Sequence, residues 1–230
     1  MLVKTYGSTI VGINAITITI EVNIDIGVAF FLVGLPDNAV KESQQRIEAA
    51  LRNNGYKIPK KKVTINMAPA DLRKEGSAYD LTLAIGILAA SEQIKAINVG
   101  DYIIMGELSL DGSLQPIKGA LPIAIEAKKS GFKGFILPEQ NAREAAIVSG
   151  ITIYGVSNIG QVIDFFNGKQ ALIPTEIDTR DDFYSKINEF EFDFSDVKGQ
   201  ENIKRALEIA AAGGHNVVRI ETPLHVAVLH

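Results

Sequence analysis

The sequence contains no cysteine, which excludes disulfide bonds, thiolate catalysis and zinc sites with sulfur ligands. Histidine is scarce, and its three copies stand at positions 215, 225 and 230, so the bulk of the chain supplies none for a metal site. The longest apolar runs end after about ten residues, too few to cross a bilayer. The amino terminus lacks the pattern of a secretory signal. These absences predict a cytoplasmic protein without a membrane partner.

Charge of one sign is also not in large excess, because the net charge is -4 over 230 residues. Such a value does not demand a polyanionic partner. The one local basic run is KIPKKK at 57–62, which is typical either of a solvated strand or loop edge or of a surface that contacts nucleic-acid phosphates. The candidate DNA-contacting edge consists of Arg52, Lys57, Lys60, Lys61 and Lys62.

What the sequence does contain is a regular succession of strand and helix patterns. Residues 16–27 alternate apolar and polar side chains, which predicts a half-buried strand, and 28–35 is expected to return beside it as a more buried hairpin partner. Asp37 is placed to cap a helix that ends near residue 53. The further predicted elements are a strand at 61–69, a helix at 79–90, two strands within 102–117 joined by Asp111 and Gly112, a helix at 118–131, a strand at 134–138, a helix at 141–150, a strand at 151–156 and a helix at 158–168. This order predicts an α/β (α+β) fold, a mixed sheet covered by helices.

Three regions are expected along the chain. Residues 1–168 form the main domain, and 169–192, which are acidic and lack periodicity, form a linker. Residues 193–230 begin a second domain, with a helix in 198–214 that ends at glycine and a buried strand at 215–220.

The stretch APADLRKEGSAYDL at 68–81 places Ser77 in a small-residue turn just before a helix. Such a turn can present a nucleophilic hydroxyl, for which Lys118 is the weak candidate for the base. In the alternative interpretation, Ser77 and Asp80 only cap the start of the helix.

Several long stretches together resemble one family. VKGQENIKRALEIAAAGGHN closely resembles the beginning of the ATPase domain in the ComM/YifB family of magnesium-chelatase-like AAA+ ATPases. The earlier stretches that agree with this family are GLPDNAVKESQQRIEAAL, INMAPADLRKEGSAYDLTLAIGIL and GELSLDGSLQPIKGALPIAIEAKKSGF. The resemblance implies a Lon-protease-like domain with the ribosomal-protein domain-2-like fold, followed by the start of an AAA+ domain.

The resemblance also allows a comparison with the serine and lysine of Lon proteases. It places Ala78, not Ser77, at the nucleophile position, and Leu121 at the lysine position. Leucine cannot accept a proton, so we expect no catalytic residue here and treat a Ser77–Lys118 peptidase as the alternative.

For the full-length family the resemblance implies ATP, magnesium, hexameric rings and DNA remodelling by branch migration in natural transformation. A phosphate-binding loop of the form G-x-x-x-x-G-K-[ST] does not occur before position 230, so we expect a chain truncated before this loop, without ATPase activity or a cofactor of its own. The predicted role is therefore a non-catalytic scaffold that self-associates and contacts DNA. ATP-driven metal insertion of the magnesium-chelatase type is the second alternative.

Overall fold

A computed structural model describes residues 1–177, 196–215 and 217. The chain divides into two compact units, Met1–Asp178 and Thr179–His230. Among the described residues, none of the helices combines the length and the apolar character needed to cross a membrane.

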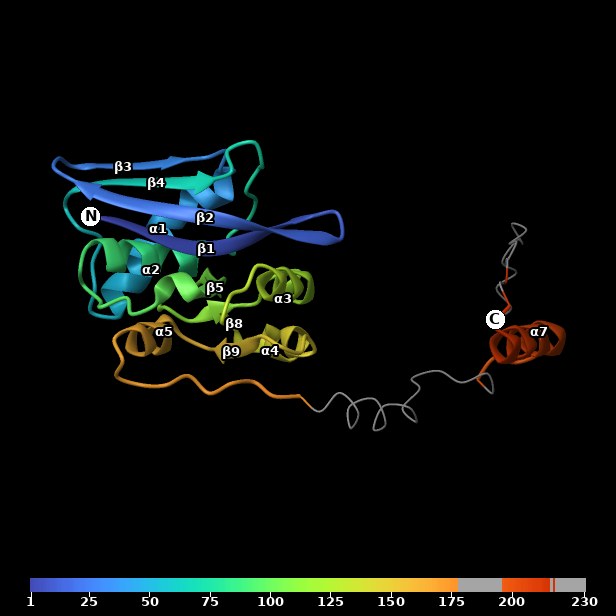
Figure 1. The fold of residues 1–230 in the computed structure, drawn as a ribbon. Coiled ribbons are helices and arrows are strands. Elements are labelled where there is room, and N and C mark those ends of the chain that lie inside the picture. Colours follow the sequence, from blue (N-terminus) through green and yellow to red (C-terminus); the bar gives the residue numbers. More distant parts are fainter. Residues whose placement is uncertain (178–195, 216, 218–230) are drawn as a thin grey trace, which may run out of the picture. The chain divides into compact units, whose positions relative to one another are not determined.

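The first unit alternates strands with helices over most of its length (Figure 1). Its elements are β1 (Leu2–Val11), β2 (Asn14–Asp25), β3 (Ala29–Val33), α1 (Asn38–Asn53), β4 (Lys62–Ala68), α2 (Asp80–Ala90), a 3-10 turn (Val99–Asp101), β5 (Tyr102–Ile104), β6 (Glu107–Leu108), β7 (Leu114–Gln115), α3 (Ala120–Lys129), β8 (Gly134–Pro138), α4 (Glu139–Ala146), β9 (Thr152–Val156) and α5 (Ile159–Phe166).

The main sheet has seven strands in the order β3-β4-β2-β1-β5-β8-β9, and it is mixed. Antiparallel pairing joins β1, β2 and β4, whereas β3 runs parallel to β4, and β1, β5, β8 and β9 run parallel to one another. The predicted α/β class with a mixed sheet is thus confirmed.

The predicted hairpin of residues 16–27 with 28–35 is wrong. β4 lies between β2 and β3 and pairs with both, as Figure 1 shows. β3 is therefore an edge strand, and it is less buried than expected: Phe31 is 50 % exposed. The sequence pattern showed two adjacent strands but not the third strand, distant in sequence, that separates them. The strand β1 was not predicted, although it lies inside the sheet between β2 and β5.

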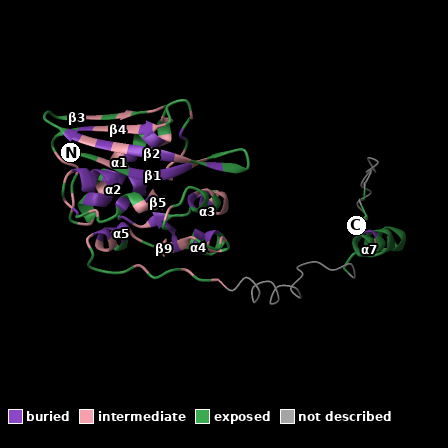
Figure 2. Cartoon of the chain, viewed as in Figure 1, coloured by how far each residue is buried: buried purple, intermediate pink, exposed green. Residues whose placement is uncertain are grey.

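The core forms where α2 packs against β1 and β2 (Figure 2). In β2 every second residue from Ile18 to Ile24 is buried, in keeping with the period of two of a strand. All residues of α2 are buried, and Gly86 allows the helix to lie close to the sheet, since a Cβ there would stand 2.8 Å from Val22 Cγ2. This packing fixes the start of α2 relative to the sheet.

Local signals gave several elements correctly. Asp37 caps α1 by accepting a hydrogen bond from the backbone N–H of Val40 at 2.8 Å. Asp111 and Gly112 lie in the turn between β6 and β7, as predicted, and Gly112 has a φ of 93°. The stretch 102–117 contains three strands instead of two, because Tyr102–Ile104 joins the main sheet by itself.

The end of the first unit includes part of the stretch that the sequence assigned to a linker. The backbone N–H of Thr175 donates to the carbonyl of Ile153 in β9 at 2.8 Å, and Leu172 packs against the core. In the second unit, α7 (Glu201–Gly213) ends at Gly214 with a φ of 63°, in agreement with the predicted helix and its glycine stop. The strand predicted at 215–220 lies almost wholly outside the described residues.

Candidate functional site

Asp37 connects the start of α1 to the turn that precedes α2. One carboxylate oxygen caps α1, and the other accepts a hydrogen bond from the backbone N–H of Gly76 at 3.0 Å. Gly76 has a φ of 82°, which a residue with a side chain adopts only with strain. The turn that carries Ser77 is therefore tied to a second helix start.

Ser77 is half-buried, and its hydroxyl donates a short hydrogen bond to Glu107 Oε2 at the beginning of β6. The serine thus faces a carboxylate, not a lysine amine. The predicted capping role is wrong, because Tyr79 precedes the first residue of α2 and no side chain caps this helix. The reason is that the hydroxyl is already bound to Glu107.

Asp80, in the first turn of α2, faces Arg46 of α1 in a bidentate ion pair. Arg46 Nε lies 2.6 Å from Asp80 Oδ2, and Nη2 lies 3.0 Å from Oδ1. The backbone N–H of Leu108 adds a third hydrogen bond to the carboxylate at 3.2 Å. Asp80 therefore joins α1, α2 and β6, and it does not cap the helix.

Burial dominates the electrostatics of this pair. The side chain of Asp80 is 1 % exposed, and desolvation raises the pKa of its carboxyl, although Arg46 opposes that rise. The hydrogen bond to Asp80 in turn raises the pKa of Arg46, so the guanidinium stays charged. A buried ion pair of this kind stabilises a structure only while both partners are present.

Lys74 lies earlier in the same loop and is fully buried. Its Nζ donates to the carbonyl of Leu72 at 2.7 Å and makes a shorter hydrogen bond to the carbonyl of Pro69. Desolvation lowers the pKa of this amine. The buried amine therefore stabilises the loop 69–74 by binding two of its backbone carbonyls.

The start of α3 is the second position that the comparison with Lon proteases requires. Lys118 is exposed, and it precedes Gly119, which has a φ of 75° and stands before the helix. The backbone N–H of Leu121 donates to Glu144 Oε1 at 3.0 Å. Among the hydrogen bonds and ion pairs of the described residues, none joins Ser77 to Lys118. The Ser77–Lys118 dyad thus stays a prediction, and the hydroxyl of Ser77 has Glu107 as its partner.

The five residues of the basic edge lie on different elements. Arg52 stands in the last turn of α1, where its guanidinium pairs with Glu48 at 2.6 Å. Lys57, Lys60 and Lys61 belong to the connection between α1 and β4, and Lys62 is the first residue of β4. All four lysines are exposed. Pairing with Glu48 partly neutralises Arg52, so the lysines carry most of the positive charge of this edge.

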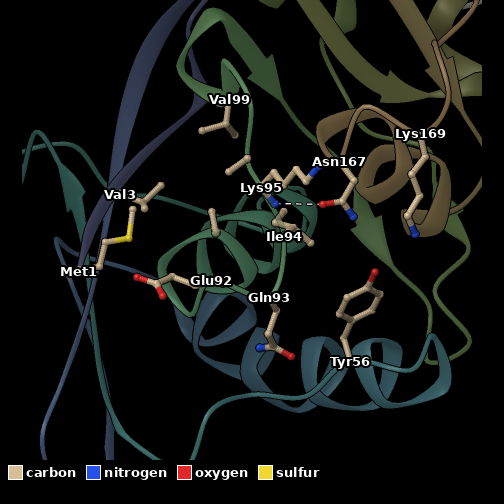
Figure 3. A pocket seen from close by; sticks show the side chains of 12 residues that line it. Met1, Val3, Tyr56, Glu92, Gln93, Ile94, Lys95, Val99, Asn167 and Lys169 are labelled. Carbon is tan, nitrogen blue, oxygen red and sulfur yellow. Dashed lines mark hydrogen bonds between the residues drawn. The ribbon is translucent and has the colours of Figure 1, made fainter.

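A hollow of about 800 Å³ opens beside β1, the end of α2 and the loop that follows it (Figure 3). Apolar side chains such as Val3 and Val99 line it together with Glu92 and Lys169. The backbone N–H of Lys95 donates to Asn167 Oδ1 at 3.0 Å across this region. Ser77 and its partners do not line the hollow, so it is separate from the Ser77 turn. Among the described residues, no three histidine, aspartate or glutamate side chains gather to hold a metal ion.

Three residues that determine the site were not found from the sequence: Arg46, Lys74 and Glu107. Arg46 lies three positions after Ser43, on the buried side of α1, so helical periodicity carried a weak signal. No sequence pattern marked Lys74 or Glu107. Their partners are loop carbonyls and a residue distant in sequence, which only the fold brings into contact.

The fold and this site can be compared with known proteins. The family described as subunit ChlI of magnesium chelatase matches residues 20–141, more than half of the chain, and a second description, magnesium chelatase subunit ChlI, matches residues 193–224. The chain belongs to the ComM/YifB family of magnesium-chelatase-like, AAA+-like proteins.

Individual relatives agree with this assignment. The protein YifB of Escherichia coli (strain K12) is 44 % identical over 216 residues, which are 92 % of this chain and 41 % of the relative. The competence protein ComM of Haemophilus influenzae is 41 % identical over 220 residues, which are 95 % of this chain and 43 % of ComM. The chain thus spans about two fifths of the length of these relatives.

A more distant similarity concerns the first unit. Lon protease 2 of Bacillus subtilis is 32 % identical over 126 residues, which are 54 % of this chain and 22 % of the protease. This similarity is consistent with the Lon-like character of the first unit.

Proposed function

We propose that the first unit is a catalytically silent Lon-protease-like domain that acts as a scaffold in a ComM-like AAA+ protein. The observation that carries this proposal is the closed polar cluster at the start of α2. There Ser77 donates to Glu107, and Asp80 forms a buried ion pair with Arg46. The turn that corresponds to the nucleophile turn of Lon proteases is thus held by contacts that join helices to strands.

The partner of Ser77 supports the silent role, because its hydroxyl is bound to a carboxylate and not to a lysine amine. A serine nucleophile needs a base within hydrogen-bond reach of its hydroxyl. Lys118 is exposed at the start of another helix, and Leu121, at the lysine position of the Lon pattern, cannot take a proton. The buried lysine of the loop, Lys74, directs its amine to the carbonyls of Pro69 and Leu72.

For the whole protein we propose self-association into a ring that remodels DNA by branch migration in natural transformation. The name of the relative ComM, a competence protein, supports this proposal. ATP and magnesium are assigned to parts of the full-length relatives outside the match, since residues 1–230 contain no G-x-x-x-x-G-K-[ST] run. The work of the first unit is then to position neighbouring subunits and the motor.

The scaffold role is tested in a full-length relative such as ComM of Haemophilus influenzae, with and without the part that matches residues 1–168. We expect the shortened protein to lose ring assembly, measured by mass photometry, and branch migration, measured on a synthetic four-way DNA junction. The unshortened relative serves as the control and should show both. Normal rings and normal branch migration by the shortened protein would contradict the proposal.

The second candidate function is a serine–lysine peptidase, and the similarity to Lon protease 2 favours it. A fluorophosphonate probe and a casein assay distinguish the two functions. We expect neither labelling nor turnover above that of the Ser77→Ala variant. Labelling that depends on Ser77 and is lost in Lys118→Ala would instead establish the peptidase.

A further inference from the structure

Residues 26–35 form an exposed apolar edge at one side of the main sheet. Five large apolar side chains in this stretch are between 47 % and 94 % exposed. They are Ile26, Val28, Phe31, Val33 and Leu35. Contiguous exposed apolar surface of this kind commonly marks an interaction site.

The backbone of β3 is open along the same stretch. Within the described residues β3 pairs only with β4, so every second residue directs its N–H and C=O groups away from the sheet. Soluble proteins usually protect such an edge with charged side chains, proline or a bulge. Residues 26–35 contain no charged residue and no proline. The edge is thus a template for another extended chain.

The edge is also held in a fixed position. Gly34, just after β3, lies so close to β4 that a Cβ there would stand 2.1 Å from the carbonyl oxygen of Met67. Phe30 and Leu32 pack against the core from the other side of the strand. A strand fixed in this way can accept a partner without first becoming ordered, which lowers the entropic cost of binding.

Positive charge gathers at the beginning of β3. Lys60 and Lys61 line a hollow of about 450 Å³ together with residues 24–28, and no ion pair holds either lysine among the described residues. Lys62 is the register partner of Ala29, and its Nζ lies 5.8 Å from the centre of the Phe31 ring. Asp25 is the one acidic residue that lines this hollow, so positive charge prevails there.

We propose that β3 docks an extended peptide segment that adds an eighth strand to the seven-stranded sheet, antiparallel to β3. The segment has apolar side chains at every second position, which cover Phe31 and Val33, and acidic residues at its carboxyl end. The antiparallel direction brings that end to the beginning of β3, beside Lys60, Lys61 and Lys62. Main-chain hydrogen bonds supply affinity, and the lysines select the acidic end.

The lysines alone would also suit a nucleic acid. A peptide strand explains more of the surface, because phosphates gain nothing from an uncharged apolar edge with unpaired backbone groups. The inference is drawn from the edge strand and its lysines alone, and it does not rest on the proposed scaffold role.

The test uses the full 230-residue chain and a fluorescein-labelled peptide in which valine alternates with threonine before two carboxyl-terminal aspartates. Fluorescence anisotropy measures binding. We expect saturable binding, and at least a tenfold loss of affinity when alternate peptide nitrogens are methylated, since methylation removes the strand hydrogen bonds. Replacing the aspartates by lysines should also weaken binding at least tenfold.

Protein variants test the same surface from the other side. Phe31→Lys places a charge on the edge and should abolish binding of the peptide. Ile125→Lys is the matched control, because Ile125 lies on α3 with a similar exposed fraction of 52 %, and it should bind normally. Lys60→Glu with Lys61→Glu should remove the preference for aspartate over lysine at the end of the peptide. Circular dichroism confirms that each variant is folded.

Three results would overturn the proposal. One is binding that methylation of the peptide leaves unchanged. Another is the absence of peptide binding while a labelled DNA duplex binds through Lys60 and Lys61. If Phe31→Lys leaves that DNA binding unchanged, the lysines belong to a nucleic-acid site. The last is a dimer in sedimentation velocity that Phe31→Lys dissociates while no peptide binds, which would make a second copy the occupant.

Discussion

The resemblance to Lon proteases assigns the serine position to the start of α2 and the lysine position to the start of α3. The two helix starts differ in their burial and in their contacts. At α2 the polar groups are buried or half-buried and each has a partner, with Asp80 bound to both Arg46 and the N–H of Leu108. At α3 the lysine candidate, Lys118, is exposed, and Leu121 contacts Glu144 through its backbone. The start of α2 joins several elements of the structure, whereas the start of α3 is an exposed turn.

This difference shows what each position contributes. A buried ion pair is costly to break, because the partner left behind is a charge without solvation. Removing an exposed lysine leaves no buried charge behind, so it costs little stability. We therefore expect substitutions at α2 to affect stability and substitutions at α3 to have little effect, and neither to change a peptidase activity.

The largest effect is expected for Arg46→Ala, which leaves the carboxylate of Asp80 buried without its partner. The free energy of unfolding should fall by about 3 kcal/mol, measured by urea denaturation. Arg52→Ala on the same helix is the control, since Arg52 and Glu48 form an exposed pair that contributes about 0.5 kcal/mol or less. Equal losses in the two variants would contradict the structural role of the Arg46–Asp80 pair.

Lys74→Met should cost about 1–3 kcal/mol, because the carbonyls of Pro69 and Leu72 lose a buried donor. The loss should also depend on pH. The folded-state pKa of Lys74 lies below 10.5, the ordinary pKa of a lysine. Between these two pKa values the unfolded chain binds the proton and the folded chain does not. The stability of the wild type relative to the variant should therefore increase as the pH rises through that window.

A constant difference between the two proteins up to pH 10.5 would contradict this assignment. The measurement is a series of urea denaturations at increasing pH. Lys118→Met, which removes an exposed amine, is the matched control.

Ser77→Ala and Glu107→Gln should each lower the free energy of unfolding by about 0.5–1.5 kcal/mol, the usual contribution of one hydrogen bond. The double variant separates a direct contact from independent effects. Its loss should be smaller than the sum of the two single losses, since both changes remove the same hydrogen bond. Fully additive losses would contradict the contact.

The smallest effect is expected at the start of α3. Lys118→Ala should change the free energy of unfolding by less than about 0.5 kcal/mol, as is usual for an exposed side chain. Leu121→Lys, which restores the residue type of the Lon pattern, should not create casein hydrolysis. Ala78 stands at the nucleophile position, and the neighbouring Ser77 remains bound to Glu107. Hydrolysis by this variant would show that the α2 turn is still competent.

Much of the fold could be predicted because its signals are local. The helix that Asp37 caps, the turn at Asp111 and Gly112 and the glycine stop at Gly214 depend on neighbours a few residues away. The hairpin of β2 with β3 was predicted wrongly for the opposite reason. Whether two successive strands pair depends on what can pack between them, and here β4 does so.

The candidate site shows the same division. The motifs place Ala78, which follows Ser77 in the same turn, and Leu121 at the two Lon positions. They did not give the contact of Ser77 with Glu107. That pair is separated by 30 residues, and no periodic pattern links them.

The sequence by itself determined the family, the α/β class and most helix boundaries, because these follow from motifs, periodicity and caps within short stretches. Only the tertiary structure decided that β3 lies at an edge, that Lys74 is buried and that Asp80 pairs with Arg46. Each of these facts depends on which distant segments exclude water from a side chain or a strand. Burial of a side chain and pairing of distant residues depend on how all segments pack together, and the sequence alone does not show this.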